Sequence, residues 1–298
     1  MSLVDLPRFE MLRPASLAAL CGTLAERHAA GKSTVLYAGG TDWMVEQEMR
    51  PPLADGQEPA LVLDIGRLPD LRGVSQIGDT LRIGAAATYL EMQRSPAVRL
   101  RAPLLERMGR DVGAVQIQAR GTLGGNLATA SPAADGVAAL AAYDATIVLQ
   151  SARGERKIPL ADLQTGYKKS LREGDEVIVA VEIALPAKAS PWFWRKVGAR
   201  RAQAISKVAL AGVAEIKDGW AVRFGLGMAS VGPVTAHLWN TRALVQSKPL
   251  RELGAEEVDA AVASDVSPLD DVRSTGEYRL HCAKSVTREF LRELGARV

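Results

Sequence analysis

Two glycine-rich loops constrain this chain more than any other feature of its sequence. The first spans Leu36 to Trp43 and reads LYAGGTDW, and the second spans residues 121–126 and reads GTLGGN. Each loop follows an apolar stretch and leads into an expected helix or turn. Glycines let backbone amides approach a ligand closely and point together at an anion. Two such loops, far apart in the sequence, indicate a ligand with more than one phosphate that is held from two sides.

Each loop also has a purely structural interpretation. Residues 39–42 could form a tight turn in which Thr41 or Asp42 caps a helix. Residues 122–126 could form a buried junction between a strand and a turn, with Asn126 bonded to its own backbone. Asp135, just downstream, could accept a hydrogen bond from a ribose hydroxyl or from a nearby amide. Taken together, the two loops favour phosphate binding.

Composition excludes several classes of protein. The chain has 298 residues, enough for one or two domains, and its 47% apolar and 24% charged residues are typical of a soluble globular protein. A net charge of +3 without a basic run gives no indication of nucleic-acid binding. The N-terminus lacks the pattern of a signal peptide, and no apolar run is long enough to span a membrane.

The cysteine and histidine content argues against metal chemistry on this chain. Cys21 and Cys282 lie far apart, so a disulfide framework is not expected and a reducing, cytoplasmic compartment fits better. Two cysteines are too few to ligate an iron–sulfur cluster. The three histidines have no ligand neighbours at useful spacing, so no metal site is expected.

Helices and strands are expected to alternate irregularly, which favours an α+β fold over a doubly wound sheet. Ser16 and Ser95 are expected to cap helices, and the alternation of apolar residues over 177–183 predicts a half-buried strand. Helices are also predicted over 235–244 and 278–294, the latter burying Tyr278, Val286, Phe290 and Leu294. The two prolines between 186 and 191 suggest a domain boundary.

The motifs, in their order along the chain, resemble a known family. AGGTD at 38–42, GTLGGNL at 121–127 and SPAAD at 131–135 are followed by the segment from Phe193 to Val208, then by DVRS at 271–274 and YR at 278–279. Together they closely resemble the FAD-binding medium subunit of molybdenum hydroxylases, a group that includes the medium subunit of carbon monoxide dehydrogenase and the flavin domain of xanthine dehydrogenase. The resemblance covers almost the whole chain.

The resemblance implies an α+β architecture in two parts. An FAD-binding domain of the vanillyl-alcohol-oxidase (PCMH) type would occupy residues 1–186, with subdomains of about 1–58 and 59–186. A smaller α+β domain, like the C-terminal domain of the carbon monoxide dehydrogenase flavoprotein, would occupy residues 187–298.

The resemblance also implies which residues bind FAD, and it implies no catalytic or metal-binding residue. The pyrophosphate would be wrapped by the backbone amides of Leu36, Tyr37, Ala38, Gly39, Gly40, Thr41, Asp42 and Trp43. The second half of the cradle would comprise Thr122, Gly124, Gly125 and Asn126. Asp135 would hold part of the FAD through a hydroxyl group. Lys196 would lie near the flavin ring, with Ala180 or a neighbour packed against the ring and Val112 as an apolar neighbour. A surface lysine beside Arg200 and Arg201 is the alternative for Lys196.

The function implied by the resemblance is electron transfer within a complex. A large subunit with the molybdenum cofactor would oxidise the substrate, a small subunit with two 2Fe-2S clusters would pass on the electrons, and FAD on this chain would deliver them to NAD or another acceptor. Two alternatives stay open. A self-sufficient FAD-dependent oxidoreductase would turn over a substrate by itself, and a non-enzymatic scaffold would have lost FAD.

Overall fold

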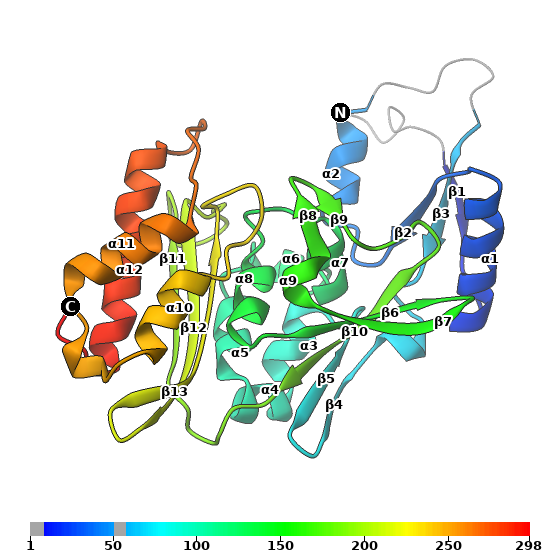
Figure 1. The fold of residues 1–298 in the computed structure, drawn as a ribbon. Coiled ribbons are helices and arrows are strands. Elements are labelled where there is room, and N and C mark those ends of the chain that lie inside the picture. Colours follow the sequence, from blue (N-terminus) through cyan, green and yellow to red (C-terminus); the bar gives the residue numbers. More distant parts are fainter. Residues whose placement is uncertain (1–8, 51–57) are drawn as a thin grey trace.

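Three main sheets separated by helices build the molecule in successive layers (Figure 1). The computed structural model describes residues 9–50 and 58–298. The N-terminal residues 1–8, where no signal peptide was expected, lie outside the described residues, and so does the segment 51–57 that precedes the expected subdomain boundary. The α+β class is confirmed. No described helix is both long enough and apolar enough to cross a membrane.

The first sheet is parallel, with strand order β1-β3-β2, and comprises β1 (Phe9–Leu12), β3 (Ala60–Asp64) and β2 (Thr34–Tyr37). Helix α1 (Leu17–Ala29) packs its buried leucines in the same core as this sheet. It begins where the sequence predicts, because the Ser16 hydroxyl accepts a hydrogen bond from the amide of Ala19. The short helix α2 (Trp43–Glu48) follows the first glycine loop.

The second sheet is antiparallel with strand order β4-β5-β10-β6-β7. Its strands are β4 (Val74–Ile77), β5 (Thr80–Gly84), β10 (Val177–Ala184), β6 (Thr146–Ser151) and β7 (Gly154–Pro159), and the 3-10 turn η2 (Pro69–Leu71) precedes them. The prediction that residues 177–183 form a half-buried strand was wrong in its burial, because both faces of β10 are covered. A register shift between Ile178 and Ala180 turns Val177 and Val179 toward one core and Val181 toward the other.

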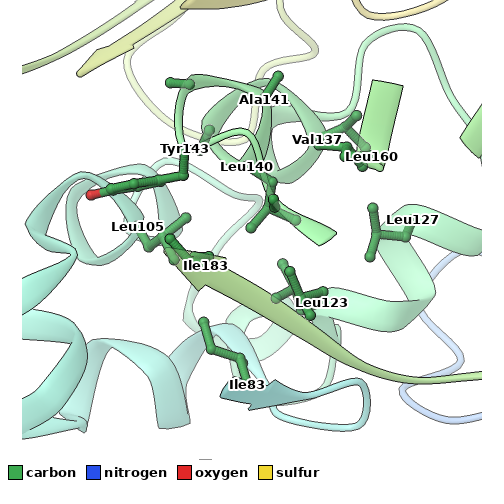
Figure 2. Packing of buried hydrophobic residues seen from close by; sticks show 14 of the residues in the cluster. Ile83, Leu105, Leu123, Leu127, Val137, Leu140, Ala141, Tyr143, Leu160 and Ile183 are labelled. Atoms are coloured by element: carbon green, nitrogen blue, oxygen red, sulfur yellow. The ribbon is translucent and has the colours of Figure 1, made fainter. Parts of the chain in front are cut away.

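A layer of helices fills the space between the second and third sheets. Leu123 and Leu127 converge on Val137 and Leu140 above the strands of the second sheet (Figure 2). Ser95 caps its helix as predicted, by accepting a hydrogen bond from the amide of Val98. The layer comprises α3 (Tyr89–Arg94), α4 (Pro96–Arg101), α5 (Pro103–Gly109), α6 (Val115–Gln118), α7 (Leu123–Ala128) and α8 (Asp135–Ala142). The nearby turn α9 (Leu160–Leu163) leads into a small hairpin of β8 (Gln164–Gly166) and β9 (Lys169–Ser170).

The third sheet is an antiparallel meander of β11 (Trp192–Val197), β12 (Val208–Lys217) and β13 (Trp220–Ala229). One face packs against α8 and the other against the C-terminal helices (Figure 1). Two glycines of β13 allow the close approach to α8. A Cβ on Gly225 would lie 2.0 Å from the carbonyl oxygen of Ala142, and one on Gly227 would lie 2.1 Å from that of Ala138.

The C-terminal helices differ from the prediction in two places. The helix expected over 235–244 begins only at Trp239, because Ala236 exchanges backbone hydrogen bonds with Met228 instead. Tyr278 was expected on the buried face of the last helix but is 44% exposed. These elements are α10 (Trp239–Gln246), the 3-10 turn η3 (Leu250–Glu252), α11 (Ala255–Asp265) and α12 (Gly276–Glu293).

Candidate binding cleft

The fold brings the two glycine-rich loops into contact. Arg120, just before the second loop, donates from Nε to the carbonyl oxygen of Gly39 at 3.3 Å and from Nη2 to the hydroxyl of Tyr37 at 3.2 Å. Thr129 donates from Oγ1 to a carboxylate oxygen of Asp42 at 2.9 Å. Residues about 80 positions apart in the sequence therefore lie in direct contact.

Glycine is required where the loops meet. A Cβ on Gly39 would lie 2.1 Å from the carbonyl oxygen of Arg120, so a larger residue would push the loops apart. Gly40 has a φ of +73°, in the left-handed region that glycine adopts readily. Asp42 precedes α2, but its side chain forms no hydrogen bond with the amides of that helix. The capping interpretation of the first loop therefore fails for Asp42.

The backbone amides of the two loops are used differently. In the second loop, the amide of Leu123 donates to Ala87 O, that of Gly124 to Ala85 O and that of Gly125 to Thr122 Oγ1, at 3.1, 2.8 and 3.0 Å. In the first loop, the amides of residues 38–43 donate to no other residue of the described chain. The first loop therefore offers a run of free donors, while the second loop contributes shape and side chains.

The residues that carry these amides line a cleft of about 450 Å³ between the loops. The predicted site residues on its wall are Leu36, Tyr37, Ala38, Gly39, Gly40, Thr41, Asp42, Trp43, Val112, Thr122, Gly124, Gly125 and Asn126. The sequence analysis missed others, among them Tyr89, Ile117, Lys168, Arg172, Val177 and Ile178. The sequence predicted the apolar pair Val177 and Ile178 only as part of a half-buried strand. The two cations, Lys168 and Arg172, lie in or beside the β8–β9 hairpin, where no motif marks them as ligand-binding residues.

Three buried polar atoms around the cleft lack a partner among the described residues: Trp43 Nε1, the hydroxyl of Tyr89 and Oδ1 of Asn126. Burial raises the pKa of Tyr89, and the negative charges of Asp135 and Asp42 raise it further. The phenol therefore stays protonated at neutral pH and keeps a proton to donate. Unpaired buried polar groups are costly, so their clustering here indicates a ligand that would satisfy them.

Two predicted residues, Asp135 and Lys196, form a buried ion pair outside the lining of the cleft. Lys196 Nζ lies 2.6 Å from Asp135 Oδ2 and donates to the carbonyl oxygen of Asp111 at 2.9 Å, while the Ser206 hydroxyl donates to Asp135 Oδ1 at 2.7 Å. The two side chains are only 10% and 9% exposed, so Lys196 is not a surface lysine. Burial raises the pKa of Asp135, and Lys196 opposes that rise.

The last two predicted residues, Val112 and Ala180, have different surroundings. Val112 lines the cleft, next to Asp111, whose carboxylate accepts a hydrogen bond from the Trp194 indole at 2.9 Å. Ala180 is fully buried between its strand partners in β5 and β6 and does not line the cleft, whereas its neighbour Ile178 does. Within residues 9–50 and 58–298, no group of histidine, cysteine and acidic side chains is placed to hold a metal ion.

Comparison with known proteins gives matches over nearly the whole chain. A model of the FAD binding domain in molybdopterin dehydrogenase matches residues 7–186, and a model of the CO dehydrogenase flavoprotein C-terminal domain matches residues 194–294. The nicotine 6-hydroxylase medium subunit of Paenarthrobacter nicotinovorans is 29% identical over 99% of this chain and 100% of its own length. The nicotinate dehydrogenase FAD-subunit of Eubacterium barkeri is 30% identical over 81% of each chain. A chain of carbon monoxide dehydrogenase from Hydrogenophaga pseudoflava has a TM-score of 0.89 at 25% identity, covering 96% of this chain and 97% of that one.

Proposed function

This chain belongs to the family of FAD-binding domains of molybdopterin dehydrogenases, and on that basis we propose that it is the electron-transfer subunit of a molybdenum hydroxylase complex. Its cofactor is FAD, and it is an oxidoreductase subunit of the molybdenum hydroxylase family, as its relatives are. Its fold is that of an FAD-binding domain of the PCMH type followed by a smaller C-terminal domain.

The assignment of the cofactor site is based on the run of free amides at residues 38–43. Consecutive backbone N–H groups without a partner among the described residues, on residues that line one cleft, can form a concave site for an anion. A pyrophosphate offers two adjacent anionic groups to such a site. We assign the pyrophosphate of FAD to these amides. The second loop would support them from the opposite wall through Thr122 and Asn126.

The remaining site residues are assigned roles by their surroundings. Val112 and Ile178 would supply apolar contacts within the cleft. Asp135 and Lys196 would anchor the wall that carries Val112, because Lys196 bonds the carbonyl group of Asp111. A direct contact of either side chain with FAD stays a proposal. When bound, FAD supplies the redox chemistry, while the protein holds it and excludes water.

The names of the relatives support the partners that we propose. Relatives are described as a medium subunit, a FAD-subunit and a medium chain, each of which names one part of a larger enzyme. By analogy, this chain would assemble with a large molybdenum-cofactor subunit and a small subunit with two 2Fe-2S clusters. It would pass electrons from those clusters to NAD or another acceptor. The unpaired cysteines Cys21 and Cys282 favour the cytoplasm as its compartment.

We also propose the division of the chain at residues 186 and 187. The first family model ends at residue 186 and the second begins at residue 194, and the segment between them crosses to the third sheet.

The first experiment is to purify the chain alone and record its visible spectrum, then to identify the cofactor released on denaturation. Oxidised-flavin bands with release of FAD are expected. The second step is to co-express the chain with candidate large and small subunits and to test for copurification. A colourless chain that also fails to bind added FAD would contradict the proposal and favour a scaffold.

Electron transfer is tested separately from FAD binding. The FAD-loaded chain is reduced with dithionite under anaerobic conditions and then mixed with NAD, a soluble quinone or oxygen, while the return of the flavin band is followed. Reoxidation by one acceptor identifies it as the electron acceptor. The rival, a self-sufficient oxidoreductase, predicts that an organic substrate reduces the flavin of the isolated chain. The proposed subunit requires its partners for this reduction.

A further inference from the structure

A second cleft lies behind the first glycine loop and is dominated by arginines. It has a volume of about 440 Å³, and two carboxylates, Asp64 and Glu91, are the acidic groups on its wall. Five guanidinium groups also line it, those of Arg13, Arg67, Arg72, Arg94 and Arg120. The cleft therefore has an excess of three positive charges. Positive charge gathered in a hollow of this kind attracts anions.

Three of these arginines are held in place by the protein. Arg13 Nε lies 2.8 Å from Asp64 Oδ2, and Arg72 Nη1 donates to the carbonyl oxygen of Gly66 at 2.9 Å. Arg120 is held by the first glycine loop through the two hydrogen bonds described above. A guanidinium has five N–H donors, so each group retains donors that are not used in these bonds. The orientation of these side chains is therefore set before any ligand arrives.

The two carboxylates of the cleft do not neutralise its other two arginines. Arg67 and Arg94 form no ion pair within the described part of the chain. The carboxylates are already occupied: Asp64 also accepts from the amide of Gly66, and Glu91 accepts from Thr88 in the capping box of α3. The excess positive charge is therefore not neutralised from within the cleft.

The arginine cleft and the FAD cleft share a wall. Tyr37, Ala38, Ala86 and Thr122 line both of them. Of the amide-bearing residues 38–43, however, only Ala38 reaches the arginine cleft. A ligand in the arginine cleft would therefore lie directly behind the FAD cradle without competing for its amide donors.

We propose that the arginine cleft binds a pyrophosphate group, either as part of a nicotinamide dinucleotide or as free pyrophosphate. Planar guanidinium groups match pairs of phosphate oxygens, and their hydrogen bonds to phosphate are charge-assisted. A pyrophosphate supplies two adjacent anionic groups, so its oxygens can pair with more of the five guanidinium groups than those of a single phosphate can. This site is additional to the FAD site and does not depend on the proposed electron transfer.

The test uses the FAD-loaded protein and isothermal titration with inorganic pyrophosphate and with NAD. The variant R67M/R94M removes the two unpaired arginines, and R99M/R201M removes two exposed arginines elsewhere as a charge-matched control. We expect R67M/R94M to bind pyrophosphate about tenfold or more weakly, because hydrogen bonds to charged groups are lost, and the control to bind as the natural chain does.

The outcomes distinguish a dinucleotide from free pyrophosphate as the ligand, and other outcomes overturn the proposal. An equal loss of NAD binding in R67M/R94M identifies a dinucleotide, whereas binding of pyrophosphate without NAD identifies the free anion. The proposal is overturned if the natural chain binds neither compound, or if R67M/R94M and the control lose affinity equally. It is also overturned if R67M/R94M loses FAD, because the arginines would then belong to the FAD site.

Discussion

Replacing Lys196 with methionine should destabilise the folded chain by about 3–5 kcal/mol at neutral pH, the usual cost of breaking a buried ion pair by removing one partner. The substitution keeps an unbranched apolar stem but removes the ammonium group 2.6 Å from Asp135 Oδ2. The carboxylate would retain its hydrogen bond from Ser206 and little else, in a site where its side chain is 9% exposed. Burial of an uncompensated charge thus supplies most of the effect.

The effect should depend on pH with a definite sign. Burial raises the pKa of Asp135 in the folded protein above its ordinary value, so this group favours folding below the ordinary aspartate pKa. That contribution is lost as pH rises through the folded pKa. Without Lys196 the folded pKa rises further, so the loss extends to higher pH. The difference between the variant and the natural chain should therefore be smallest in acid and largest above the raised pKa.

The assay is urea unfolding of both proteins across a series of pH values, followed by circular dichroism. Lys157→Met serves as a control, because its ion pair with Glu182 is more exposed and should contribute less than about 1 kcal/mol. The double variant K196M/D135N, which removes both charges, should recover most of the stability. A loss below that of the control, a loss equal at every pH, or no recovery in the double variant would refute the reasoning.

Three further predictions concern the cofactor, a helix cap and a second ion pair. Gly39→Ala should lower the ratio of flavin to protein absorbance, because its Cβ would lie 2.1 Å from a backbone carbonyl oxygen, whereas Gly22→Ala, with nothing within 4 Å, should not. Asp265→Ala should lower stability in thermal unfolding by about 1–2 kcal/mol, because its carboxylate accepts hydrogen bonds from two amides at the start of α10; an unchanged Tm would refute this. Arg156→Gln should destabilise the chain at neutral pH, since the hydrogen bond from Arg156 lowers the pKa of Glu176. That contribution is present above the ordinary glutamate pKa and is lost as pH falls through the depressed value, so urea unfolding in acid should show no difference.

Local features of the fold could be predicted from the sequence because short-range chemistry determines them. The caps at Ser16 and Ser95 depend on a hydroxyl and an amide three residues away, and both are confirmed. Two apolar runs over 208–216 and 220–228, around a short polar turn, predict a hairpin, and β12 and β13 form it. The meeting of the two glycine loops was inferred from the likeness of the loops to each other and from the resemblance, since no local pattern specifies a contact across 80 residues.

Features set by tertiary contacts could not be predicted. The burial of β10 depends on a register shift against its partner strand, and the late start of α10 depends on the pairing of Ala236 with Met228. The ion pair of Asp135 with Lys196 joins residues 61 positions apart. The sequence also cannot tell that the amides of the second loop are already bonded to Ala85 and Ala87, so that only the first loop keeps free donors.

The approach of β13 to α8 has a consequence for how relatives of this chain can exchange parts during evolution. Gly225 and Gly227 leave no room for a side chain against the carbonyl groups of Ala138 and Ala142, and α8 is buried along its whole length. A C-terminal segment inherited from a relative would have to bring glycine at both positions, or the recipient helix would have to shift. We therefore expect the two parts of the chain to be inherited together, with substitutions at 225 and 227 accompanied by changes along α8.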